Sequence, residues 1–187
     1  MDEFMKWDRP RRAEGGSYRV MSRSTRTRRS EDGVSFERHL GGSARMRSPE
    51  RSIEIQRLLG SDIVMQLDEC IALPAERAEI ERAMLLSLRW AERSKAAFAD
   101  AEGHALFGIV HGGVHTDPRS RPAAALQAIG FAGYPIGGPA PGQPEHDRHA
   151  MPAHLPPALL GARPPTLPAR GRPEAPAECF PPARAPV

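Results

Sequence analysis

Three residues at the end of one apolar stretch, Asp68, Glu69 and Cys70, carry groups that could do chemistry. They follow DIVMQL (62–67), whose run of apolar side chains is typical of a strand buried on both faces of a parallel sheet. The carboxyl end of such a strand is where α/β proteins place binding and catalytic groups. We therefore expect two carboxylates and a thiol at one edge of a sheet; a strand followed by a plain polar turn is the alternative.

Two further apolar stretches end in glycine pairs. HALFGIV (104–110) is followed by His111 and two glycines, and GYPI (133–136) by Gly137 and Gly138. On parallel strands these ends share one rim with Asp68. A carboxylate and exposed backbone N–H groups there suit the edge of guanine, where N1–H and the amine donate and O6 accepts. Each glycine pair taken alone is also explained by a tight turn.

Helical patterns separate these strands. SPERSIEIQRLLG (48–60) has an N-cap serine, a proline at the first helical position and a glycine at its end. One partly buried face is predicted for it, formed by Ile53, Ile55, Leu58 and Leu59. The longest helix is predicted over 75–99, with a buried face that consists of Ile80, Met84, Leu85, Leu88 and Ala91. A short helix is predicted over 121–130.

The alternation of strands and helices predicts an α/β fold with parallel strands and right-handed crossovers, either a doubly wound sheet or a (β/α)8 barrel. A complete barrel needs about 250 residues, so 187 residues hold only part of one. We divide the chain into a basic, loop-rich region (1–47) with a short strand or two and much disorder, a core (48–138), and a tail (139–187).

The tail breaks the pattern, because it holds 14 of the 20 prolines. Such proline density excludes helices and central strands, and few large apolar residues remain to form a core. We expect this tail to be disordered. Pro, Ala, Arg and Gly have the codons richest in G and C, so we hypothesise that the reading frame shifts near residue 139.

Charge and cysteine content limit the partners and the compartment. Residues 1–51 hold 13 Lys and Arg against 8 Asp and Glu, a net +5, which suits a polyanion such as nucleic acid or a plain solvated arm. Cys70 and Cys179 have no ligand spacing between them, so neither a disulfide framework nor a zinc knuckle is indicated. No stretch approaches 18 apolar residues. We expect a cytoplasmic protein without a membrane segment.

Five motifs together resemble the tRNA-guanine transglycosylase (queuine tRNA-ribosyltransferase) family: DGVSFERHLGGS, SPERSIEIQRLLGSDIVMQLDEC, RWAERS, LFGIVHGGV and IGFAGYPIGG. The resemblance runs from about Phe4 to Gly138. It implies a (β/α)8 barrel with a zinc-binding insertion, usually a homodimer, that exchanges guanine at the wobble position of tRNA for a 7-deazaguanine. The cysteine in DEC resembles the bacterial form, which uses the 7-aminomethyl precursor of queuine.

The resemblance also implies roles for the matching residues. The target base is flipped into a pocket, and a carboxylate attacks the ribose to give a covalent glycosyl-enzyme intermediate. By resemblance, Asp68 accepts the two guanine N–H donors, because charge strengthens both bonds. Cys70 lines the pocket, and the N–H at Gly138 binds the base carbonyl.

Two positions depart from the family pattern. The family's acid or base is an Asp in an Asp-Ser-Gly-Gly-aromatic segment; here Glu14 stands in its place, followed by Gly15, Gly16, Ser17 and Tyr18, which we assign to substrate binding. Glu14 as a plain surface residue is the alternative. His111 replaces the family's glutamine, offers one donor and one acceptor when neutral, and should bind the base more weakly.

The family's nucleophilic Asp and its zinc ligands, three Cys and one His, belong to later segments, and nothing in residues 139–187 matches them. We therefore expect no zinc ligands in this chain and an inactive fragment of a pentosyltransferase that acts in queuosine biosynthesis. The alternative is a non-catalytic RNA-binding or partner subunit that uses the basic amino-terminal region.

Overall fold

A computed structural model describes Lys6 and residues 10–16, 27–37, 44–71, 75–110 and 124–135. The elements of this part are β1 (Thr27–Ser30), β2 (Gly33–Glu37), β3 (Ala44–Arg47), α3 (Pro49–Leu58), β4 (Ile63–Met65), α4 (Arg77–Phe98) and β5 (Ala105–Phe107), with a further short helix over 124–129. The tail, 139–187, lies outside the described residues.

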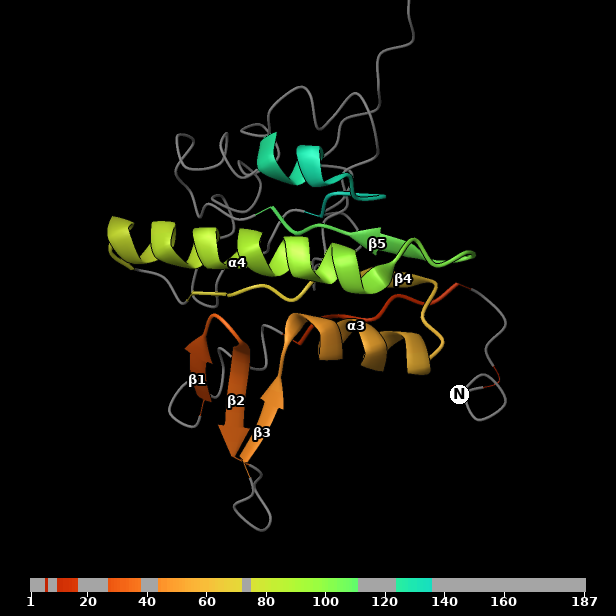
Figure 1. Cartoon of the computed structure of the whole chain (residues 1–187), viewed down its shortest axis with the longest axis horizontal. Helices are drawn as coiled ribbons and strands as arrows, with labels where there is room; N and C mark the ends of the chain where they lie inside the picture. Colours follow the sequence, from red (N-terminus) through yellow and green to blue (C-terminus); the bar gives the residue numbers. More distant parts are fainter. Residues whose placement is uncertain are drawn as a thin grey trace, which may run out of the picture.

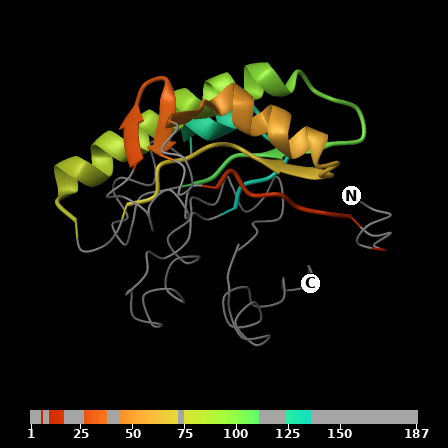
Figure 2. The same cartoon turned by 90° about the horizontal axis from the view of Figure 1, so that it is seen from below.

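A parallel layer forms the centre of the described fold. β4 pairs in parallel with β5, and isolated parallel bridges join Arg12 to Ile63 and Phe107 to Gly133. The four paired segments therefore lie in the same order in space as in the chain. Figure 2 shows α3, α4 and the 124–129 helix on one side of this layer. The expected α/β fold with parallel strands is confirmed.

The ends of α3 are where the sequence places them. Ser48 is the N-cap, and its hydroxyl accepts a hydrogen bond from the Arg51 N–H at 3.2 Å. Pro49 opens the helix, where its missing N–H costs nothing. Gly60 follows the last turn with φ +69° and donates its N–H to the Arg57 carbonyl.

The predicted buried faces of the two long helices are partly wrong. Leu58 and Leu59 of the expected α3 face are 76% and 40% exposed, while the polar Gln56 is buried. The Gln56 side-chain amide explains this, because it donates to the Met65 carbonyl and accepts from the Met65 N–H, both at 2.8 Å. On α4, Leu85 is 41% exposed and its neighbour Leu86 is buried instead.

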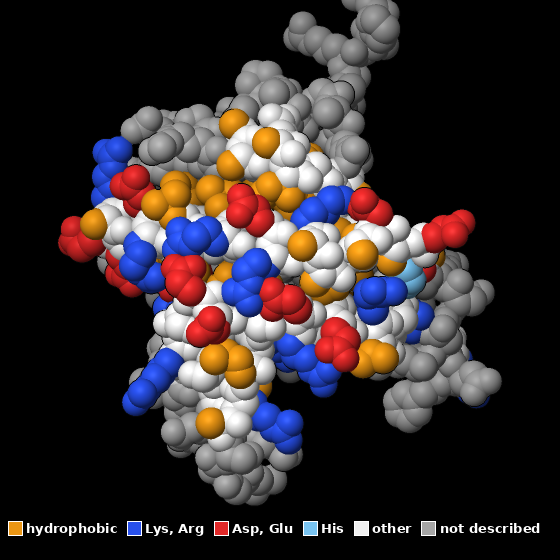
Figure 3. All heavy atoms as spheres, in the orientation of Figure 1, with side chains coloured by type: hydrophobic (Ala, Val, Ile, Leu, Met, Phe, Trp, Pro, Cys, Tyr) orange, Lys and Arg blue, Asp and Glu red, His pale blue; other side chains and the backbone are white. Residues whose placement is uncertain are grey.

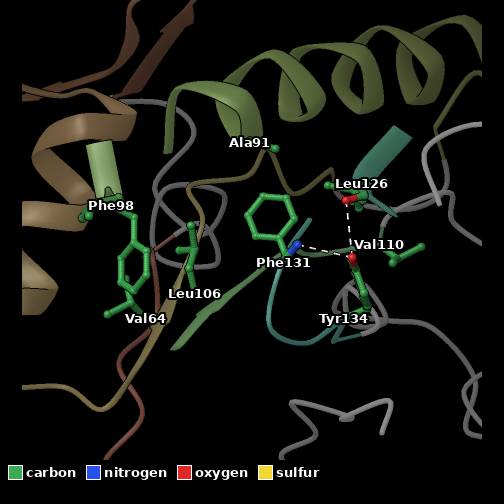
Figure 4. Packing of buried hydrophobic residues seen from close by; sticks show 9 residues of the cluster. Val64, Ala91, Phe98, Leu106, Val110, Leu126, Phe131 and Tyr134 are labelled. Atoms are coloured by element: carbon green, nitrogen blue, oxygen red, sulfur yellow. Dashed lines mark hydrogen bonds between the residues drawn. The ribbon is translucent and has the colours of Figure 1, made fainter. Parts of the chain in front are cut away.

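One apolar cluster fills the space between the parallel layer and the helices. It consists of Ile53, Val64, Ala91, Phe98, Leu106, Val110, Leu126, Phe131 and Tyr134. Figure 4 shows Phe131 beside the strands, with its N–H donating to the Tyr134 hydroxyl at 3.3 Å. This cluster holds β4 and β5 against α3, α4 and the short helix.

The described residues between 27 and 47 contain one strand more than expected. β1, β2 and β3 form an antiparallel sheet of three strands that lies beside α3 and α4 in Figure 1. In this sheet Arg29 pairs with Val34, and Val34 pairs with Arg47, so these three residues form one row across the strands. These are three strands where a short strand or two were expected, while the loops and disorder expected for the rest of 1–47 stay a prediction. We call these three strands the hairpin sheet.

Charges of both signs are mixed over the face that α3 and α4 present in Figure 3. On this face, the described Lys and Arg side chains are not gathered into one patch. In the described part of the chain, no helix is long and apolar enough to cross a membrane.

Candidate functional site

Asp68 and Cys70 lie just beyond the carboxyl end of β4, as predicted. Asp68 is buried with 4% of its surface exposed, and the Cys70 thiol donates to its Oδ2 at 3.4 Å. Burial raises the pKa of the Cys70 thiol well above its ordinary value, and the charge of Asp68 and this hydrogen bond raise it further. Cys70 therefore acts as a neutral donor beside a carboxylate.

Glu69 has a different environment from Asp68. Its buried carboxylate accepts from Arg82 Nη2 at 2.7 Å, from Arg82 Nη1 at 3.1 Å and from Arg29 Nη1 at 3.3 Å. Its backbone N–H donates to the Ser87 hydroxyl at 2.9 Å. The hydrogen bond to Glu69 raises the pKa of Arg82. Glu69 thus ties α4 and the hairpin sheet to the strand end, a role that the sequence analysis missed.

An open hollow of about 260 Å³ lies at this point and is lined by Thr27, Arg29, Glu69 and Arg82. Its two guanidinium groups share the carboxylate of Glu69. Guanidinium groups from α4 and from β1 thus hold the carboxylate of Glu69, whereas Asp68 accepts a hydrogen bond from the neighbouring Cys70 thiol.

The segment 14–16 lies against the same strand end. A Cβ at Gly15 would lie only 2.6 Å from the Gln66 carbonyl oxygen, so the backbone can approach β4 this closely only because residue 15 is glycine. Glu14 is exposed and pairs with Arg12 at 3.6 Å. The charge of Glu14 contributes to the raised pKa of Cys70, which is consistent with its lying near the 68–70 segment.

Arg47 holds this segment from the hairpin sheet. Its Nη1 donates to the Gly15 carbonyl at 3.0 Å, and the Ser52 hydroxyl donates weakly to the same oxygen at 3.5 Å. Gly16 has φ +90°, and a side chain there would overlap the Arg47 guanidinium. Gly15 and Gly16 are therefore required by close approach and by backbone conformation.

The structure brings together two of the predicted site segments, 14–16 and 68–70. The other predicted site residues, Ser17, Tyr18, His111 and Gly138, lie outside the described residues. The expected convergence of Asp68 with the glycines at 137 and 138 therefore stays a prediction.

Comparison with known proteins identifies the family. The model of the queuine tRNA-ribosyltransferase family matches residues 1–180. The chain belongs to this family. The resemblance predicted from the five motifs is thus confirmed, and with it a relationship to enzymes that transfer a pentosyl group in tRNA processing.

Relatives named queuine tRNA-ribosyltransferase support the assignment to the transglycosylase family. The protein of Cereibacter sphaeroides is 49% identical over 174 residues, which are 93% of this chain and 46% of the relative. That of Rhizobium meliloti is 54% identical over 145 residues, 78% of this chain and 39% of the relative. The chain spans less than half the length of these relatives. Both the family match and the first alignment extend past Gly138, so the limit expected there was wrong.

A metal site is not apparent in the described part of the chain. Among its His, Cys, Asp and Glu residues, no group of three or more is placed to hold a metal ion. These residues therefore do not fit the zinc that the family resemblance implies.

Proposed function

We propose that this transglycosylase-family chain carries the base-recognition part of a site for exchange of guanine in tRNA. The observation that carries the proposal is the buried carboxylate of Asp68, which stands at the end of β4 in the DEC motif. The guanine edge would present N1–H and its amine to this carboxylate. Two charge-assisted hydrogen bonds would then fix the base.

The parallel layer supports the barrel that the resemblance implies. The four paired segments follow one another in the order of the chain, and the described helices all lie on one side of the layer. Strands in chain order with helices on one side only are the arrangement of a (β/α)8 barrel. We propose that this layer is part of a (β/α)8 barrel, whose binding groups lie at the carboxyl ends of the strands. Asp68 and Cys70 are at this end of β4.

Cys70 and Glu14 have distinct proposed roles beside the base. The neutral thiol of Cys70 would line the pocket and keep Asp68 oriented through its hydrogen bond. Glu14 would serve as acid or base in place of the family's Asp, and its exposed carboxylate could turn toward a bound nucleoside. Ser17, Tyr18, His111 and Gly138 are proposed to complete the pocket.

We also propose that the 187-residue chain, taken by itself, binds the base without completing the exchange. No segment of residues 139–187 matches the context of the family's nucleophile. The proposed partners are tRNA and either guanine or a 7-deazaguanine. The proposed location of the protein is the cytoplasm. Homodimerisation stays an expectation from the resemblance.

The test is guanine binding by isothermal titration calorimetry with the wild-type chain, Asp68→Asn and the control Asp32→Asn. The asparagine at position 68 would turn an amide donor toward the donors of the base. Each lost charge-assisted bond is worth about 1.5–3 kcal/mol, so the Kd should rise at least about tenfold. Asp32 is an exposed residue of the β1–β2 turn, and its replacement should leave the Kd unchanged.

Two further measurements separate the outcomes. Incorporation of labelled guanine into tRNA above a no-enzyme control would show that the chain is active and would refute the proposed inactivity. Salt-dependent tRNA binding without any guanine binding would instead favour the alternative, a non-catalytic RNA-binding subunit.

A further inference from the structure

We propose that the row Arg29–Val34–Arg47 of the hairpin sheet positions the two site segments, 14–16 and 68–70, relative to each other. The proposal rests on the function proposed above, because it concerns the site at which the base would bind. It assigns Arg29 and Arg47 as positioning residues, which act through Glu69 and Gly15 and do not touch the base.

The register of the hairpin sheet places the two arginines at opposite ends of one row. Arg29 on β1 faces Val34 on β2, and Val34 faces Arg47 on β3. Paired residues of antiparallel strands point to the same face of the sheet. Neighbouring strands lie about 4.8 Å apart, so the two anchors are separated by two strand spacings that backbone hydrogen bonds fix.

Each end of the row holds one site segment. Arg29 donates to Glu69, the residue after Asp68, at 3.3 Å. Arg47 donates to the carbonyl of Gly15, the residue after Glu14, at 3.0 Å. In the middle, Val34 is 1% exposed and belongs to a buried cluster with Leu67, the residue before Asp68.

The row is itself held in place by α4. Arg89 makes two hydrogen bonds to the Glu31 carboxylate in the β1–β2 turn, and the Trp90 indole donates to the Glu31 carbonyl at 2.9 Å. Arg93 donates to the same carbonyl at 2.5 Å. Because these hydrogen bonds hold the turn against α4, the hairpin sheet has little freedom to tilt. Its row can therefore keep the segments 14–16 and 68–70 at a fixed separation.

This arrangement has a chemical consequence for the proposed site. A guanine ring held by Asp68 must lie at the right distance from the proton donor or acceptor that Glu14 is proposed to supply. A displacement of about 1 Å between them can lower the reaction rate roughly a hundredfold. The charges of Arg29 and Glu14 both act on the pKa of the Cys70 thiol, Arg29 lowering it and Glu14 raising it, as their opposite signs require, which agrees with both residues lying near the 68–70 segment.

The experiment compares Arg47→Met with Arg45→Met and Arg47→Lys. Arg45 lies two residues earlier on β3, is exposed, and carries the same charge and side chain. For each variant, amide hydrogen exchange of residues 12–16 and guanine affinity are measured, together with the thermal unfolding midpoint. Arg47→Met should speed exchange at 14–16 and raise the guanine Kd, each about tenfold. Arg45→Met should change neither, and Arg47→Lys should restore much of both, because a lysine can also donate to the Gly15 carbonyl.

The outcomes distinguish this inference from the proposed function. If the wild-type chain binds guanine and Arg47→Met binds it equally well, the positioning role is refuted while the proposed function stands. If the wild-type chain does not bind guanine, the proposed function fails, and faster exchange at 14–16 in Arg47→Met alone still supports the positioning of the segment. Equal exchange in the wild type, Arg47→Met and Arg45→Met overturns the inference in either case.

Discussion

The parallel layer and the hairpin sheet are stabilised in different ways. The parallel layer is covered by helices and held by nine buried apolar residues. The hairpin sheet contributes only Val34 to a buried cluster, and polar contacts through Arg29, Arg47 and the turn at Glu31 join it to the rest of the described fold. Apolar burial is non-directional, whereas hydrogen bonds fix orientation. The layer therefore provides most of the stability, and the hairpin sheet provides alignment at the edge where Asp68 lies.

Replacing a phenylalanine by alanine in each region should give the largest difference in the free energy of unfolding. Phe131→Ala removes a fully buried ring from the cluster of the parallel layer and should reduce the free energy of unfolding by about 3–5 kcal/mol. Phe36 lies on the hairpin sheet and is only partly buried, so its ring buries less apolar area than the ring of Phe131. Phe36→Ala should therefore reduce the free energy of unfolding by roughly 1–2 kcal/mol. Urea denaturation of both variants measures this. Equal losses would contradict the division between the two regions.

Breaking a polar anchor should have a smaller effect on stability. Arg82→Met leaves the buried carboxylate of Glu69 with Arg29 as its remaining guanidinium partner, so we expect a loss of about 1–3 kcal/mol. Arg28→Met, on the exposed face of β1, is the matched control and should stay within about 0.5 kcal/mol of the wild type. A loss no greater than that of the control would show that Glu69 is held without Arg82.

Glu50 on α3 pairs with Arg93 on α4, the arginine that also holds the turn of the hairpin sheet, and this pair gives a pH-dependent test. Burial alone would raise its pKa, but hydrogen bonds from Arg93 and Ser48 lower the pKa to about 2. Because the folded pKa is below the ordinary value of 4.5, the stabilisation is complete above about pH 5 and is lost as the pH falls toward 2.

Glu50→Gln should therefore destabilise the chain at pH 7 and match the wild type near pH 2. Glu50 is partly exposed, so solvent screening limits the difference at pH 7 to roughly 0.5–1 kcal/mol. Thermal unfolding across this pH range measures it. A constant difference at all pH values would mean that the effect does not come from the charge of Glu50.

Local signals explain what the sequence could predict. Ser48, Pro49 and Gly60 determine the ends of α3 through interactions within a few residues, and the apolar run at 63–65 determines β4. Asp68 and Cys70 were found because they follow that run directly. Each of these features depends on neighbouring residues in the chain.

Long-range polar contacts explain what the sequence could not predict. The hairpin sheet has no apolar period, and the Trp90 hydrogen bond to Glu31 spans 59 residues. Gln56 and Glu69 are buried although their types usually lie at the surface, because partners from other elements satisfy them. The frame shift near residue 139 stays a prediction; translating the other frames of the nucleotide sequence would test it.

The smallest expected effect concerns the thiol where the two regions meet. Burial, the charge of Asp68 and its hydrogen bond together raise the pKa of Cys70, so little thiolate should be present at pH 8 and alkylation should be slow. Asp68→Asn removes the charge, so it should lower this pKa and speed alkylation by roughly 3- to 10-fold. The rates are measured in a Cys179→Ser background, with Asp32→Asn as the control for charge at a distance. In denaturant the variants should react equally, because the difference belongs to the folded chain. If Asp68→Asn reacted no faster than the control when folded, the carboxylate of Asp68 would not control the thiol, and the assignment of Cys70 as its neutral donor would be wrong.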